Sequence, residues 1–200
     1  MNIANKMTIS RIILIPFIML FLLPIPYAWA EGWNNFVNGL GGNIIALVLF
    51  SLASFTDFLD GYYARKMGLV SNFGKFLDPI ADKLLVISTF ACLVSLNRAG
   101  VVVMIVIIAR EFLVTGMRLM AAQQGVVVAA SMFGKAKMVT QLIAIIYLLL
   151  EPILFKIFNT NYPSRAMKII RIVLIGIAAI MTVLSGADYM WKNRRFFANA

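Results

Sequence analysis

The sequence places four of its five aspartates inside one window, which reads TDFLDGYYAR over residues 56–65 and GKFLDPIADK over residues 74–83. The stretches around this window are apolar and long enough to cross a membrane. A carboxylate in such surroundings is costly to bury, so it is rarely kept there without a use. The window therefore decides the fold, a helical membrane bundle that must hold these acids, and directs the search for a function.

The composition is that of an integral membrane protein. Of the 200 residues, 62% are hydrophobic, and no proline- or serine-rich linker divides them, so we expect a single all-α domain over residues 1–200. The net charge of +10 is explained by anionic lipid headgroups and by a phosphorylated substrate, so no nucleic-acid partner is expected. The absence of histidine excludes imidazole metal sites, and a single cysteine excludes an intramolecular disulfide.

We predict a polytopic membrane protein with six transmembrane helices, preceded by a short amphipathic N-terminal segment over residues 1–11. The predicted spans cover residues 12–30, 40–66, 74–96, 101–122, 138–154 and 166–191. The first span also resembles a signal peptide that would be cleaved after Ala30. We prefer a retained helix, because the rest of the chain is also typical of a membrane protein. Placing both ends in the cytoplasm collects most Lys and Arg residues there, so the window should face the cytoplasm.

The acids of the window are expected to form two stripes on neighbouring antiparallel helices. The first stripe has Asp57, Asp60, Gly61 and Ala64 at helical spacing, with Arg65 beside it, and the second has Gly74, Asp78 and Asp82. Four facing carboxylates repel one another at low dielectric, so either some are protonated or divalent cations lie between them. Oxygen ligands without His or Cys fit Mg²⁺, Mn²⁺ or Ca²⁺, and paired metals suit phosphoryl chemistry.

Small residues in both stripes have two interpretations. Gly61, Ala64 and Gly74 would allow close helix packing, or they would leave a pocket for a flat ligand group beside the acids. Arg65 would extend to the membrane surface, or it would neutralise a phosphate. With four acids nearby, the pocket is the better interpretation.

The seven residues of the two stripes, together with Arg65, resemble in type and spacing the signature of the CDP-alcohol phosphotransferases. The likeness covers the whole chain, since the six-span layout is also similar to that family. Three further motifs resemble its phosphatidylglycerophosphate synthase branch: LDPIADK (77–83), Arg110-Glu111 with Arg118, and GKAK (134–137) with Gln141.

The resemblance implies a bacterial membrane enzyme and assigns the residues roles. Two divalent cations, Mg²⁺ or Mn²⁺, would be held by Asp57, Asp60, Asp78 and Asp82. The nucleotide would be bound by Asp60, Gly61, Ala64, Arg65 and Gly74. Asp82 would also act as the general base. The implied reaction joins CDP-diacylglycerol and glycerol 3-phosphate to give phosphatidylglycerophosphate and CMP, and homodimers are a feature of the family.

The phosphate of the acceptor needs cations on the neighbouring helices. The candidates are Arg110 and Arg118 in the fourth predicted span, and Lys135 and Lys137 just before the fifth. Arg110 has an alternative role in a structural ion pair with Glu111, and Lys137 has one as a charge near lipid headgroups. Asp188 should form a structural pair with Lys192, four residues on.

Other functions compete with this interpretation. Within the family, the acceptor would be an inositol phosphate, or phosphatidylglycerol in the synthesis of cardiolipin. In another class, intramembrane acids line the paths of divalent-cation or proton-coupled transporters. The acids argue against a transporter, because they cluster toward one membrane face and no acidic path continues to the other.

Overall fold

The computed structural model describes the backbone of residues 3–67, 72–123, 131–158 and 164–194, and the side chains in these ranges except those of residues 3–6, 57–67, 72–76, 78 and 79. The described residues are helical and contain no strand, which confirms the all-α class. The helices are α1 (Ile3–Leu22), η1 (Ala28–Ala30), α2 (Glu31–Asn38), α3 (Leu40–Met67), α4 (Asn72–Ser95), α5 (Val101–Gln123), α6 (Met132–Ile157) and α7 (Arg165–Lys192).

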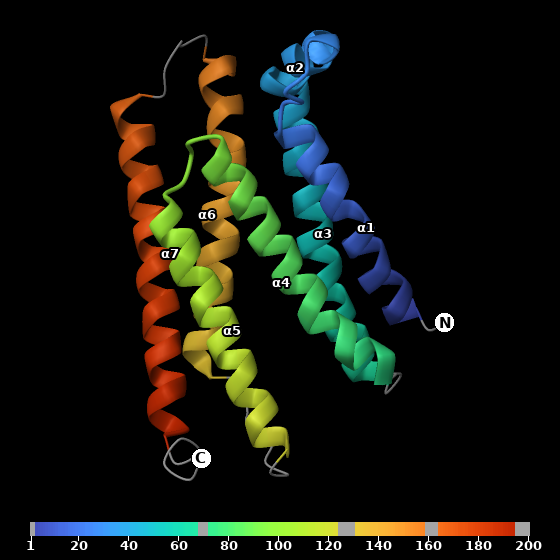
Figure 1. Cartoon of the computed structure of the whole chain (residues 1–200), viewed down its shortest axis with the longest axis vertical. Helices are drawn as coiled ribbons and strands as arrows, with labels where there is room; N and C mark the ends of the chain where they lie inside the picture. Colours follow the sequence, from blue (N-terminus) through green and yellow to red (C-terminus); the bar gives the residue numbers. More distant parts are fainter. Residues whose placement is uncertain (1–2, 68–71, 124–130, 159–163, 195–200) are drawn as a thin grey trace.

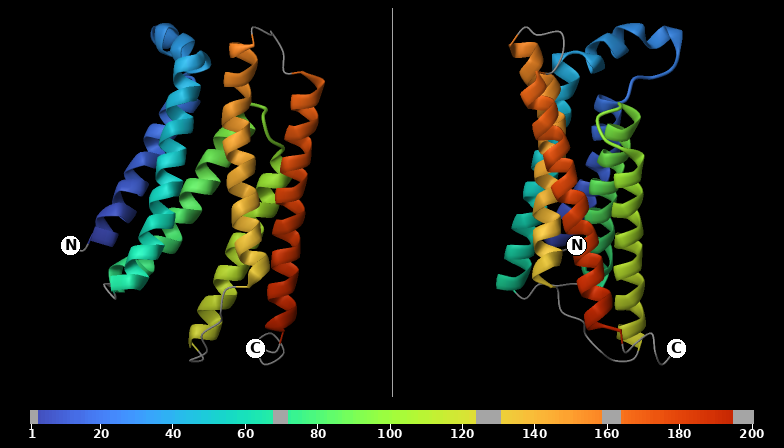
Figure 2. Two further views of the ribbon diagram at one scale, coloured as in Figure 1. Left: turned by 180° about the vertical axis from the view of Figure 1, so that it is seen from behind. Right: turned by 90° about the vertical axis from the view of Figure 1, so that its left-hand side faces the viewer.

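Helix α1 differs from the predicted first span at both ends. It begins at Ile3, so residues 3–11 form its first turns instead of a separate amphipathic segment, and it ends at Leu22 instead of residue 30. Pro24 and Pro26 explain the early end, because proline lacks a backbone N–H and disfavours helical geometry in the residue before it. The chain then turns, and α2 runs across the upper end of the bundle (Figure 2, right). The Asn34 side chain holds this corner through hydrogen bonds of 2.7 and 2.8 Å to the backbone N–H and carbonyl of Ile25.

The long helices form a bundle with two halves (Figures 1 and 2). In one half α1 packs against α3 and α4, and in the other α7 packs against α5 and α6. Contacts of α3 with α6 and of α4 with α5 join the halves. The N-terminal end of α1 and the C-terminal end of α7 lie toward the lower side of Figure 1. The end of α3 and the start of α4 lie on the same side. The aspartate window therefore lies at this lower end.

The apolar core ends where the window begins. Phe50, Phe90 and Leu148 bring together α3, α4 and α6 in the core, and each is at most 1% exposed. Ala53 is the core residue on α3 that lies one turn before Asp57, and Leu85 on α4 follows Asp82 by three residues. The window thus begins at the edge of a well-packed region, which fixes the helices that carry it.

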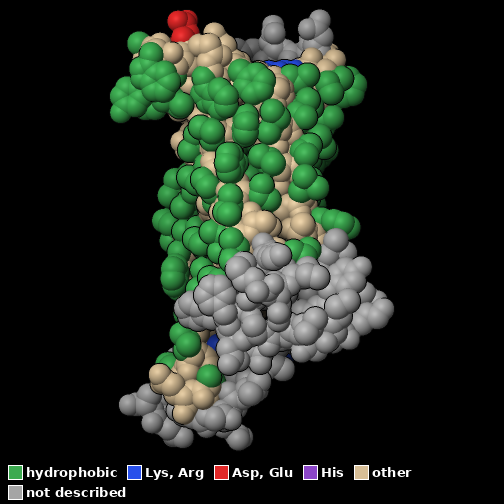
Figure 3. Space-filling model, turned by 90° about the vertical axis from the view of Figure 1, so that its right-hand side faces the viewer, with side chains coloured by type: hydrophobic (Ala, Val, Ile, Leu, Met, Phe, Trp, Pro, Cys, Tyr) green, Lys and Arg blue, Asp and Glu red, His purple; other side chains and the backbone are tan. Residues whose placement is uncertain are grey.

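Membrane insertion is supported for part of the bundle. Among the described residues, α6 and α7 are long and apolar enough to span a membrane, and the bent pair Ala28–Asn38 and Leu40–Thr56, with an angle of 67°, is a third candidate. Figure 3 shows that hydrophobic side chains cover most of the described surface on one side of the bundle. The chain is thus a plausible membrane protein with two or three candidate spans, and six spans remain a prediction.

A buried carboxylate lies at the upper end of the bundle, far from the window. Glu151 on α6 is 2% exposed, and its Oε2 accepts a bond of 3.5 Å from Arg171 on α7. Arg98, in the turn between α4 and α5, donates to Asn43 Oδ1 at 3.0 Å. Burial lowers the pKa of the Arg98 guanidinium, and the nearby Glu151 carboxylate opposes this shift. Asn97 beside it has a φ of 56°, which asparagine tolerates better than most residues, and it lies between α4 and α5, where the third and fourth predicted spans also leave a gap.

Candidate active site

The aspartate window spans the end of α3 and the start of α4. Asp57 and Asp60 fall in the last turns of α3, and Asp78 and Asp82 in the first half of α4, so the predicted pair of helices is present. Of the four acids, only Asp82 is among the described side chains. The side chains of Asp57, Asp60, Gly61, Ala64, Arg65, Gly74 and Asp78 lie outside the described residues. The facing stripes and the nucleotide pocket therefore stay predictions.

Asp82 lines a small cavity between α4, α5 and α6. The polar lining consists of Asp82 and Lys83 from α4, Glu111 from α5, and Lys137 and Gln141 from α6. The water-accessible volume is about 10 Å³, enough for about one water molecule. The cavity brings the window together with one of the basic residues that sequence reasoning assigned to the acceptor, although 55 residues separate Asp82 from Lys137.

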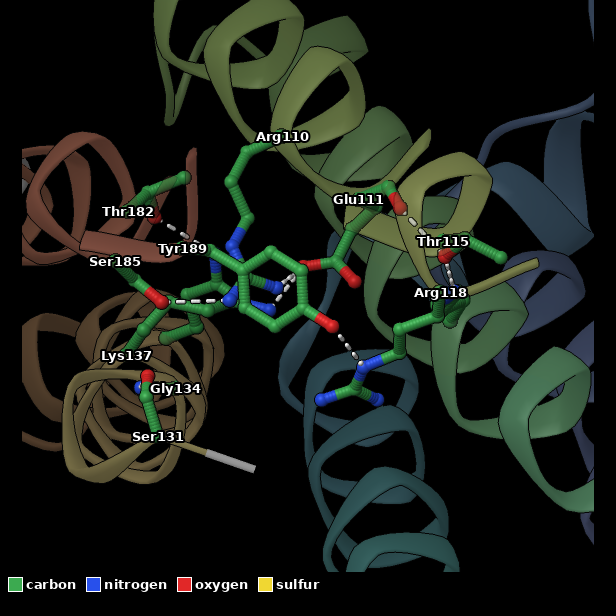
Figure 4. A network of polar contacts seen from close by, with 12 residues as sticks. Arg110, Glu111, Thr115, Arg118, Ser131, Gly134, Lys137, Thr182, Ser185 and Tyr189 are labelled. Atoms are coloured by element: carbon green, nitrogen blue, oxygen red, sulfur yellow. Dashed lines mark hydrogen bonds and ion pairs between the residues drawn. The ribbon is translucent and has the colours of Figure 1, made fainter. Parts of the chain in front are cut away.

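Glu111 is the centre of the charged network beside this cavity (Figure 4). The side chain is 10% exposed, and its Oε1 forms ion pairs with Lys137 Nζ and, at 3.4 Å, with Arg110 Nη1. A buried carboxylate between two cations fixes both of them, because without it both would be buried without a counter-charge. The ion pair considered as an alternative role for Arg110 is thus present, and Lys137 points into the bundle.

Arg110 is also bound on its other side. Its Nη2 donates to Ser185 Oγ on α7 at 2.6 Å, next to Gly134 at the start of α6. A side chain on Gly186 would meet the Arg110 side chain at 3.3 Å, so the glycine lets α7 approach α5 here. Two of the three guanidinium nitrogens are therefore engaged within the bundle, and Arg110 helps to hold α5 and α7 together.

Lys83 is a member of this site that sequence reasoning did not assign. Its ammonium donates to Thr115 Oγ1, and the Thr115 hydroxyl donates to the Glu111 carbonyl at 2.6 Å. The Lys83 charge is thus held beside Asp82, across from Glu111. In the sequence, the signal for Lys83 was its position directly after Asp82. That signal is weak, because the side chains of adjacent residues on a helix point about 100° apart.

Arg118 lies two turns beyond Glu111 on the same face of α5. Its Nε donates to the Tyr189 hydroxyl at 3.2 Å, and its Cζ lies 5.5 Å from the centroid of the Tyr189 ring. Tyr189 is 2% exposed, whereas Arg118 is exposed. The guanidinium is therefore anchored on α7 at one edge and open on the other.

Lys135 differs from Lys137 although both lie in the first turns of α6. Lys135 is exposed and has no side-chain hydrogen bond or ion pair with the described residues, whereas Lys137 is buried. Two positions along a helix rotate the side chain by about 200°, which explains the difference. The helix begins at Met132, and the hydroxyl of the preceding residue, Ser131, caps it by accepting from the Gly134 N–H at 3.1 Å.

Helix α7 contributes a polar stripe that sequence reasoning missed. Thr182, Ser185 and Tyr189 follow one another at helical spacing, and each is at most 2% exposed. They contact Gln141, Arg110 and Arg118 respectively. Three polar residues on one face of an apolar helix were the signal in the sequence. The predicted pair of Asp188 with Lys192 is confirmed at 2.7 Å.

Known proteins resemble the chain over nearly its full length. A relative from Bacillus subtilis (strain 168) is 43% identical, over 96% of this chain and 95% of the relative. Relatives from Rickettsia bellii (strain RML369-C), at 36% identity over 98% of this chain and 97% of their own length, and from Haemophilus influenzae, at 34% identity over 94% and 91%, carry the same name. That name is CDP-diacylglycerol–glycerol-3-phosphate 3-phosphatidyltransferase. The model of the CDP-alcohol phosphatidyltransferase family matches residues 1–187, and the chain belongs to this family.

Proposed function

We propose that the chain transfers the phosphatidyl group from CDP-diacylglycerol to sn-glycerol 3-phosphate, giving phosphatidylglycerophosphate and CMP in phospholipid biosynthesis. One observation carries the proposal: the cavity that places Asp82 beside the Glu111–Lys137 pair. The reaction needs a carboxylate that takes a proton, and it needs this carboxylate close to cations that bind the phosphate of the second substrate. The names of the relatives support the two substrates.

The donor is assigned to the aspartate window. Asp60, Gly61, Ala64, Arg65 and Gly74 would bind the nucleotide, as the family signature implies. Asp57, Asp60, Asp78 and Asp82 would hold two Mg²⁺ or Mn²⁺ ions, and an all-carboxylate set of donors fits such hard cations. When bound, the metals would supply positive charge that stabilises the pyrophosphate and the departing CMP.

The acceptor reacts at Asp82. The carboxylate takes the proton of the acceptor hydroxyl, and the oxygen forms a bond to the lipid-side phosphorus while the bond from that phosphorus to CMP breaks. Lys137, held by Glu111, and the open guanidinium of Arg118 attract the acceptor phosphate, and Lys135 and Arg110 complete the proposed set of cations. These fixed charges act by positioning and by electrostatic stabilisation.

The site fits the boundary between membrane and water. Both substrates carry phosphate, while the acyl chains of the donor stay among the lipids around the apolar helices. The excess of Lys and Arg at this end of the bundle supports an orientation toward the cytoplasm of a bacterial cell. A homodimer, implied by the resemblance, belongs to the same proposal.

A reconstituted assay tests the function. The purified full-length chain in detergent receives CDP-diacylglycerol, labelled glycerol 3-phosphate and Mg²⁺, and we expect labelled phosphatidylglycerophosphate with an equal amount of CMP. EDTA should abolish turnover, and added Mg²⁺ or Mn²⁺ should restore it. Parallel reactions with an inositol phosphate or with phosphatidylglycerol identify a different acceptor. A folded chain that makes no labelled lipid from glycerol 3-phosphate would contradict the proposal.

A further inference from the structure

Tyr189 holds the guanidinium of Arg118 from one side (Figure 4). The tyrosine is 2% exposed, its hydroxyl accepts from Arg118 Nε at 3.2 Å, and the Arg118 Cζ lies 5.5 Å from the ring centroid. The hydroxyl fixes one edge of the guanidinium, and the ring attracts its charge through a cation–π interaction. Two contacts of different kinds therefore orient the end of a long side chain that is otherwise exposed.

The rest of the guanidinium remains available for a ligand. Arginine has five N–H donors, and within the described part of the chain only the Nε–H of Arg118 has a hydrogen-bond partner. The two Nη nitrogens form a planar fork that matches two oxygens of a phosphate. Arg110 provides the contrast, since its two Nη nitrogens are occupied by Glu111 and Ser185.

From this geometry we propose that Tyr189 is a positioning residue for the acceptor phosphate, acting through Arg118. The inference rests on the proposed function and adds a residue to it. An exposed arginine samples many rotamers and loses that freedom on binding. Anchoring Nε on a buried tyrosine orients the fork before the acceptor arrives, so less freedom is lost when the phosphate binds.

The placement of Tyr189 on α7 explains why this helix takes part in the site. Arg118 and Tyr189 are 71 residues apart, and only the packing of α7 against α5 brings them together. Ser185, one turn before Tyr189, accepts a hydrogen bond from Arg110 Nη2. The polar stripe of α7 therefore orients both arginines of α5.

The test measures the KM values of both substrates in the full-length enzyme. Tyr189→Phe removes the hydroxyl and keeps the ring, and we expect the KM for glycerol 3-phosphate to rise about tenfold, as for the loss of one hydrogen bond to a charged group. The KM for CDP-diacylglycerol and the kcat should stay within about twofold. Tyr189→Leu removes the ring as well and should raise the acceptor KM further.

Two controls separate positioning from a general effect on structure. Tyr147→Phe removes a comparable hydroxyl, which donates to the Met167 carbonyl at 3.0 Å between α6 and α7, and it should leave both KM values unchanged. Because Tyr189 acts through Arg118, Tyr189→Phe should have no further effect on the acceptor KM in an Arg118→Ala background.

The outcomes are distinct. A wild-type enzyme that uses glycerol 3-phosphate, with an unchanged acceptor KM in Tyr189→Phe, overturns this inference and leaves the proposed function intact. An equal rise in both KM values, or a full effect of Tyr189→Phe without Arg118, also overturns it. A wild-type chain that does not use glycerol 3-phosphate overturns both. If Tyr189→Leu fails to fold, Tyr189→Phe alone decides.

Discussion

Two buried glutamates, in different parts of the same bundle, each hold a cation from a neighbouring helix. Glu111 pairs with Lys137 and Arg110 beside the aspartate window, and Glu151 pairs with Arg171 near the Arg98 turn. Their side chains are similarly buried, with 10% and 3% exposed. The two clusters use the same device, because a buried carboxylate is stable only with charged partners.

The surroundings of the two glutamates differ. Glu111 shares a cavity with Asp82 and Lys83, whereas Glu151 lies near the C-terminal end of α6, and this end of the helix is opposite to the window. A buried ion pair by itself thus does not indicate a site of chemistry. What distinguishes the Glu111 cluster is a further carboxylate, Asp82, and a further cation, Lys83, in the lining of the same cavity.

The largest loss of activity should follow from replacing Asp82, the further carboxylate of the Glu111 cluster. We expect Asp82→Asn to lower kcat by about a thousandfold or more, because the amide cannot accept the proton of the acceptor, and general-base catalysis is worth about 10²–10⁴. The substitution changes little in size, so thermal unfolding of the variant should resemble that of wild type. Formation of labelled lipid is the measurement, and a variant that keeps a tenth of the activity would refute the role of Asp82 as base.

Glu111→Gln should have the next largest effect, on both stability and activity. It leaves Lys137 and Arg110 buried without a counter-charge, and breaking a buried pair costs about 3–5 kcal/mol. A small displacement of a fixed group lowers rates by up to about 10². We therefore expect kcat/KM for glycerol 3-phosphate to fall by about ten- to a hundredfold.

Activity assays and thermal unfolding of the same Glu111→Gln preparation separate these effects. Lys168→Ala is a suitable control on α7, since the Lys168 side chain is exposed, forms no ion pair with the described residues and lies outside the proposed acceptor site. Its effect on kcat/KM should be below about threefold. If Glu111→Gln were fully active, the network would be structural only, like the Glu151 cluster.

Much of the helical layout could be predicted from local sequence. The fifth and sixth predicted spans lie within or nearly coincide with α6 and α7, because long apolar runs report directly on helices of that length. The first span was predicted too long at its end, since hydropathy continues through residues 24–30 while Pro24 and Pro26 end the helix. Backbone chemistry outweighed apolar character there.

The sequence predicted those residues of the site that belong to local motifs. It did not predict those that reach the site only because distant helices pack together. Asp82 and Lys137 were assigned to one end of the bundle from motif and charge, and the cavity between them agrees. Tyr189 and Ser185 were missed, because their partners on α5 are 71 and 75 residues away and no local pattern names them. The spacing of polar residues along α7 marked a buried face, but it could not identify what that face contacts.

The smallest effect on activity should come from Glu151→Gln. This variant tests whether the Glu151 cluster contributes to stability only. The glutamine keeps the shape and one carbonyl for Arg171, but it removes the negative charge near Arg98 and Arg171. Arg171 is 26% exposed, so solvent screens part of the loss and we expect about 1–3 kcal/mol lower stability. Thermal unfolding in detergent should show this loss, while kcat and both KM values at low temperature stay within about twofold of wild type. A variant with unchanged stability and a lower kcat would mean that the upper cluster is coupled to the chemistry, and the division between the two ends of the bundle would then fail.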